Sequence, residues 1–62
     1  MPVVRVTWLA GRSHEQRAEL ARVITEAVAR IGKTSPQHTQ VIFEDVAKED
    51  WSTGGTLKSD ET

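Results

Sequence analysis

The chain has 62 residues, no cysteine and a formal net charge of −1, from eight Lys and Arg against nine Asp and Glu. A single small domain covering residues 1–62 is the most that this length allows, and such a chain buries only about 60% of its unfolded surface. Disulfides and thiolate ligands are excluded, and His14 and His38 are too few and too far apart for a metal cage. No metal or cofactor is therefore expected, and oligomerisation is the expected source of stability.

Two classes of partner are disfavoured by the pattern of charge and hydropathy. Basic residues are spread along the chain, which disfavours a nucleic-acid footprint. No apolar run approaches the roughly 20 residues of a membrane span. Arg5 interrupts the first apolar segment and no small-residue cleavage site follows, so no signal peptide is expected. We expect a soluble, cytoplasmic protein.

The first element in the chain is a predicted strand over 3–9, which is rich in β-branched and aromatic residues. Pro2 precedes it and admits two interpretations. A proline at the start of a strand removes no ladder hydrogen bond, so Pro2 can be an ordinary strand-opening residue. If Met1 is removed, however, the nitrogen of Pro2 becomes a free secondary amine, which is a base rather than an amide.

A helix of about 19 residues is predicted next. Ser13 and Gln16 match a capping box at its start. Gly32 is placed as the glycine that follows the last helical turn. Between them lies a single apolar stripe at spacings of three and four residues, formed by Leu20, Val23, Ile24, Ala27, Val28 and Ile31.

The rest of the chain predicts a second strand and a hairpin. Pro36 prevents the helix from continuing through the connection, and residues 40–46 are predicted to form a strand. A strand, a helix and a strand make a β-α-β unit with parallel strands, so the fold class is α/β. Gly54-Gly55 is a turn signal for a short C-terminal hairpin. The polar residues 58–62 are expected to fray.

Assembly is expected because a two-stranded β-α-β unit leaves its strand edges and a sheet face open. Both faces of the first strand carry apolar residues, so both are expected to be covered, at least in part. Oligomerisation would then extend the parallel strand pair into a larger sheet.

These features together resemble the 4-oxalocrotonate tautomerase family. The resemblance is carried by Pro2 behind the initiator methionine, the β-α-β unit, the run Gly-Arg-Ser-His-Glu-Gln over 11–16, and the aromatic-plus-glycine segment over 51–55. It implies a keto-enol tautomerase of aromatic catabolism. It also implies a homohexamer built as a trimer of dimers, or a related trimeric arrangement.

The resemblance also implies a site. Pro2 would be the general base and Arg12 would bind a substrate carboxylate. Leu9 matches a position that contributes a backbone contact to the substrate, and Trp51 stands where the family has a phenylalanine wall. Gln40 is a departure, because the tautomerase carries a second arginine there, and glutamine cannot supply that charge.

The implied chemistry moves a proton in an unsaturated 2-hydroxy or 2-keto acid such as 2-hydroxymuconate. An unperturbed α-amine has a pKa of about 7.7 to 8.0, and apolar surroundings or a nearby cation lower the pKa of an amine. The pKa of the Pro2 amine is therefore expected to be lowered, which favours the free amine at neutral pH. With one cation in the site, a monocarboxylate or a neutral conjugated carbonyl becomes more plausible as substrate.

Two alternatives stay open at this point. A hydratase or dehalogenase relative would use a protonated proline as acid and a carboxylate to activate water, but Thr53 stands at the matching glutamate position. A non-enzymatic, self-assembling domain is the reading if Met1 is retained, because the nitrogen of Pro2 is then a non-basic amide.

Overall fold

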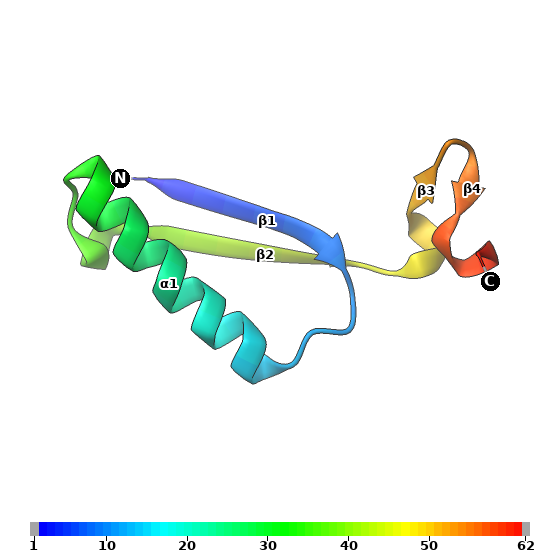
Figure 1. Cartoon of the computed structure of the whole chain (residues 1–62), viewed down its shortest axis with the longest axis horizontal. Coiled ribbons are helices and arrows are strands. Elements are labelled where there is room, and N and C mark those ends of the chain that lie inside the picture. Colours follow the sequence, from blue (N-terminus) through cyan, green and yellow to red (C-terminus); the bar gives the residue numbers. More distant parts are fainter. Residues whose placement is uncertain (1, 62) are drawn as a thin grey trace.

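The computed structural model describes residues 2–61, so the predicted removal of Met1 and the behaviour of Thr62 lie outside the described part. The elements follow the order β1 (Val3–Leu9), α1 (His14–Gly32), β2 (Gln40–Val46), β3 (Ser52–Thr53) and β4 (Thr56–Leu57). Short 3-10 turns lie at Pro36–His38, Lys48–Asp50 and Lys58–Asp60. In Figure 1, α1 lies alongside the β1–β2 pair, and the C-terminal hairpin stands apart beyond the end of β2.

The two long strands pair in parallel, as predicted. The register runs from Val3 opposite Gln40 to Leu9 opposite Val46. Val4 and Val6 on one face are half-buried, while Val3 and Arg5 on the other are exposed. The helix therefore covers one face of the sheet, and the predicted cover on the second face does not come from within the described chain.

The start of α1 confirms the predicted capping box. The Ser13 hydroxyl accepts from the backbone N–H of Gln16 at 3.2 Å, and the Gln16 side chain accepts from the backbone N–H of Ser13 at 2.9 Å. The predicted end was off by one residue, since Gly32 is still helical. Lys33 is the left-handed residue, with φ 55°, and its N–H donates to the carbonyl of Ala29.

The predicted hairpin is present. Ser52 pairs with Leu57 and Thr53 with Thr56 in an antiparallel ladder. Gly54 and Gly55 form the two-residue turn with φ 62° and 86°. Both angles are positive, as the turn that matches the twist of a tight hairpin requires.

Within a single protomer, residues 2–61 do not enclose a core. None of residues 2–61 is fully buried, and large apolar side chains such as Val3 (50% exposed) and Ile31 (70%) face solvent. The Cα radius of gyration is 14.8 Å, whereas a compact chain of this length has about 11 Å. The accessible surface is 4725 Å², above the roughly 4000 Å² typical of a folded monomer of this mass. Along residues 2–61, no helix has both the length and the apolar character that crossing a membrane requires.

Candidate functional site

Pro2 and Gln40 lie together at the first end of the sheet. The backbone N–H of Gln40 donates to the carbonyl of Pro2 at 3.0 Å. Pro2 is half-buried, and Gln40 is exposed at the first pair of the β1–β2 register. This backbone bond fixes the chain directly after the proline nitrogen, and it uses the carbonyl of Pro2 rather than that nitrogen.

Leu9 and Arg12 meet at the other end of β1. The Arg12 Nη1 donates to the Leu9 carbonyl at 2.8 Å, and the guanidinium carbon lies 4.9 Å from the centre of the Trp8 ring, within cation–π range. Gly11 has φ 130°, a conformation that glycine adopts readily, and this turn brings Arg12 back over the strand end. Arg12 thus lies folded against β1 before the helix begins.

The charge of Arg12 has no protein counter-ion in the part of the chain that the structure describes. The ion pairs there join Arg17 to Asp45, Arg22 to Glu26, and Lys58 to Glu61. A guanidinium has five N–H donors arranged to bind carboxylates, and only one bond of Arg12 goes to Leu9. Arg12 can therefore accept an external carboxylate without first breaking an ion pair.

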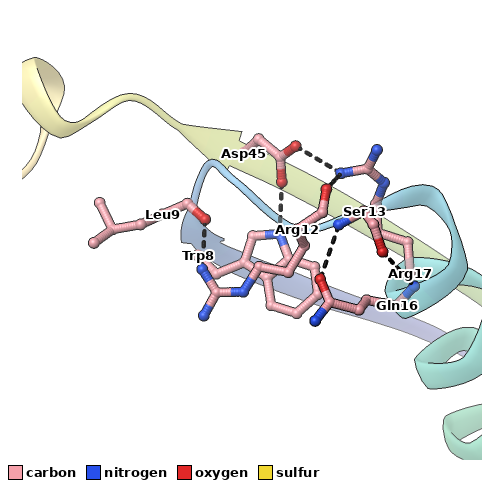
Figure 2. Close-up of polar contacts among 7 residues, drawn as sticks. All are labelled: Trp8, Leu9, Arg12, Ser13, Gln16, Arg17 and Asp45. Atoms are coloured by element: carbon pink, nitrogen blue, oxygen red, sulfur yellow. Dashed lines mark hydrogen bonds and ion pairs between the residues drawn. The ribbon is translucent and has the colours of Figure 1, made fainter.

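A group of side chains around Arg12 was missed by sequence reasoning. The indole Nε1 of Trp8 donates to one oxygen of Asp45, and Arg17 donates to the other at 3.0 Å (Figure 2). Arg17 also donates to the backbone carbonyl of Arg12 at 3.0 Å. The sequence contained one signal for this contact. Trp8 and Asp45 occupy the same position in the two predicted strands, and they form a cross-strand pair in the structure.

Trp51 lies outside the β-α-β unit. It follows the Lys48–Asp50 turn and is half-buried, and its carbonyl accepts from the backbone N–H of Lys58 at 2.8 Å. This bond joins the start of the hairpin to the segment behind it. Trp51 comes directly before β3, and the β3–β4 hairpin lies beyond the end of β2 (Figure 1).

The predicted site residues are therefore not gathered within one protomer. Leu9 and Arg12 lie together, as do Pro2 and Gln40, but β1 separates the two pairs. Its seven residue steps from Pro2 to Leu9 span about 23 Å at roughly 3.3 Å each. A substrate touching both Pro2 and Arg12 would need these residues from two different copies.

The chain is similar in sequence to proteins named as probable tautomerases. The sequence profile of the family described as "Tautomerase enzyme" matches residues 2–61. A "Probable tautomerase" of Lactiplantibacillus plantarum is 41% identical over 61 residues, covering 98% of this chain and 95% of its own. One of Ralstonia nicotianae is 38% identical over 61 residues, covering 98% and 94%.

Solved structures of 4-oxalocrotonate tautomerase proteins have the same fold as this chain. The crystal structure of a 4-oxalocrotonate tautomerase homologue matches with a TM-score of 0.95 at 37% identity, covering 100% of this chain and 98% of that one. A heterohexamer 4-oxalocrotonate tautomerase from Chloroflexus aurantiacus matches with a TM-score of 0.90 at 35% identity, covering 97% of each chain. The β-α-β unit with its short hairpin is the tautomerase fold, and by sequence and structure this chain belongs to the tautomerase family.

Proposed function

We propose that the chain is a keto-enol tautomerase that uses the amine of Pro2, exposed by removal of Met1, as its general base. The substrate is an unsaturated 2-hydroxy or 2-keto acid, and Arg12 binds its carboxylate. The observation that carries the proposal is that Arg12 is held in place but has no counter-ion among residues 2–61. It is held by the Leu9 carbonyl and the Trp8 ring, and no carboxylate of residues 2–61 pairs with it.

The proton transfer needs only these two groups. The Pro2 amine takes the proton from the 2-hydroxyl group of the enol and delivers it to a carbon of the conjugated system, so the amine ends as it began. Removal of the hydroxyl proton leaves an enolate, and the guanidinium of Arg12, bound to the carboxylate of the same molecule, stabilises its negative charge. Trp51 would limit water in the site, which strengthens that interaction.

The proposed active form is a homo-oligomer, with a hexamer built as a trimer of dimers as the specific proposal. Support comes from the lack of a closed core and from the distance between Pro2 and Arg12 along β1. The tautomerase from Chloroflexus aurantiacus is a heterohexamer, and a fused 4-oxalocrotonate tautomerase of the same fold, 28% identical, is an asymmetric trimer.

Gln40 favours a substrate with a single carboxylate. It adjoins Pro2 across the first pair of the sheet and brings no positive charge. Phenylenolpyruvate, with one carboxylate and an apolar ring, suits such a site better than the dicarboxylate 2-hydroxymuconate. A role in aromatic catabolism, which the resemblance to 4-oxalocrotonate tautomerase implies, is part of the proposal.

The test compares ketonisation of phenylenolpyruvate and 2-hydroxymuconate by the purified protein and by Pro2→Ala. Intact mass spectrometry first establishes whether the chain begins at Pro2. Activity of the wild type well above that of Pro2→Ala is the expected result, since a positioned base contributes typically about 10²- to 10⁴-fold. Equal rates for the two proteins, with Met1 absent, would rule the proposal out.

A further inference from the structure

The contacts around Arg12 close into a ring. Asp45 accepts from the Trp8 indole and from Arg17, the Trp8 ring lies under the Arg12 guanidinium, and Arg17 donates to the Arg12 carbonyl. Figure 2 shows these side chains converging on the loop between β1 and α1. The ring joins β1, that loop, α1 and β2, so each of the four segments contributes one member.

We propose that Trp8, Asp45 and Arg17 are positioning residues that hold Arg12 ready for a substrate carboxylate. The inference rests on the proposed function, because it assigns Arg12 the carboxylate-binding role. It adds three residues to that role, none of which would touch the substrate.

Asp45 is placed to do two things for Arg12. Its first oxygen orients the indole ring, and its second holds Arg17, which in turn fixes the backbone carbonyl of Arg12. Hydrogen bonds to an ionised carboxylate are stronger than neutral ones, so one side chain constrains both the face and the backbone of the loop. Among residues 2–61 no ion pair joins Asp45 to Arg12, so the charge of Arg12 stays available.

Trp8 contributes a surface rather than a charge. Its ring also stacks on Phe43, with centroids 5.3 Å apart and 23° between the planes, which fixes the indole from the second strand. An arginine held over a fixed aromatic face keeps N–H groups free to bind a carboxylate. The side chain of Arg12 is thereby ordered before binding, and less conformational entropy is lost when the substrate arrives.

Arg22 provides a matched control for Arg17. It forms an ion pair with Glu26 at 3.1 Å on the same helix, as Arg17 does with Asp45 at 3.0 Å, but it has no bond to the Arg12 loop. If only the loss of a surface ion pair mattered, Arg17→Gln and Arg22→Gln should change ligand binding by the same amount. If Arg17 positions Arg12, only Arg17→Gln should weaken binding.

The experiment measures binding of cinnamate, a stable unsaturated monocarboxylate without the enol, by NMR titration of the full-length protein. Asp45→Asn, Arg17→Gln and Trp8→Leu are each expected to weaken binding about tenfold, within the range of coupled contacts, whereas Arg22→Gln should leave it unchanged. Trp8→Phe keeps the ring without the indole N–H and should weaken binding less than Trp8→Leu. In an Arg12→Ala background, the added Asp45→Asn or Arg17→Gln change should have no further effect.

Two results would overturn the inference. One is unchanged cinnamate binding in both Arg17→Gln and Asp45→Asn, and the other is an additive loss in the Arg12→Ala background. Circular dichroism and the oligomeric mass of each variant separate loss of positioning from loss of folding. Cinnamate binding does not depend on turnover. If it requires Arg17 and Asp45 while the protein shows no Pro2-dependent tautomerisation, the result would count against the proposed base and in favour of the positioning residues.

Discussion

Pro2 and Arg12 flank opposite ends of the same strand, with Val3–Leu9 between them. Arg12 donates to the Leu9 carbonyl, and the seven residue steps from Pro2 to Leu9 span about 23 Å, much farther than a small enol acid can reach. If both act on one substrate molecule, they must come from different copies of the chain. The pairing of subunits is then part of the active site rather than only a source of stability.

Mixed oligomers of Pro2→Ala and Arg12→Ala should therefore regain activity that neither variant has alone. In a random mixture, about a quarter of the sites would combine an intact Pro2 from one copy with an intact Arg12 from another, because a site built between copies draws each residue independently. The measurement is ketonisation of phenylenolpyruvate after joint unfolding and refolding. Lack of recovery, with mixed oligomers detected by native mass spectrometry, would place both residues in the same protomer.

Gln40→Arg should shift preference toward a dicarboxylate. An arginine beside Pro2 adds a donor fork that binds carboxylates in a bidentate manner. The ratio of kcat/KM for 2-hydroxymuconate to that for phenylenolpyruvate is expected to rise about tenfold, since a hydrogen bond to a charged group contributes roughly 1.5 kcal/mol. Gln40→Lys is the control for charge alone and should raise the ratio less. If neither variant changes this ratio of kcat/KM values, residue 40 does not determine which substrate is preferred.

Ile42 tests assembly through the sheet face that α1 leaves uncovered. It lies opposite Arg5 and is 38% exposed in the isolated protomer. If another copy covers this face, Ile42→Lys buries a second positive charge beside Arg5 and should cost roughly 3 kcal/mol or more. Ultracentrifugation should then show smaller species, and the melting temperature of the wild type should rise with protein concentration. Arg22→Gln, on the helix surface, is the control, and a similar small effect of both changes would argue against this interface.

Local sequence signals predicted most of the fold because the elements depend on neighbouring residues. The bounds of both long strands and the 19-residue length of α1 agree with the prediction, as do the cap at Ser13 and the turn at Gly54-Gly55. Each of these follows from side-chain periodicity or from a backbone angle that particular residues adopt. The prediction ends α1 one residue too early, because it assigns the left-handed conformation to Gly32, whereas Lys33 adopts it.

The surroundings of Arg12 could not be predicted in the same way. Its contacts with Trp8, and those of Arg17 with Asp45, join residues from separate elements, and their geometry depends on the strand register and the position of the helix. Sequence resemblance selected Arg12 itself but said nothing about what holds it. The grouping of Pro2 with Gln40 depends on the register of β1 with β2, and that of Leu9 with Arg12 depends on the turn at Gly11.

The hairpin turn gives a prediction about Trp51. Gly55 has φ 86°, which a β-branched residue adopts only at a cost of roughly 1–2 kcal/mol. Gly55→Val should therefore loosen the hairpin, disturb the bond between the Trp51 carbonyl and Lys58, and raise KM. Gly54→Asn is the control, since asparagine is favoured at the first position of this turn. Kinetics, together with Trp51 fluorescence recorded in a Trp8→Phe background, would check the result, and equal behaviour of the two variants would contradict it.

The C-terminal end of α1 should be open to stabilisation. Lys33 holds a left-handed conformation that costs an L-residue roughly 1–2 kcal/mol, so Lys33→Gly should gain about 0.5–1 kcal/mol after the added entropy of the unfolded chain is subtracted. Gly32 is helical with open space around the position of a Cβ atom, so Gly32→Ala should gain a similar amount. Urea unfolding at fixed protein concentration measures both changes. The reverse pattern, with Lys33→Gly destabilising and Gly32→Ala neutral, would mean that the Lys33 side chain makes a contact in the assembled protein that outweighs its backbone strain.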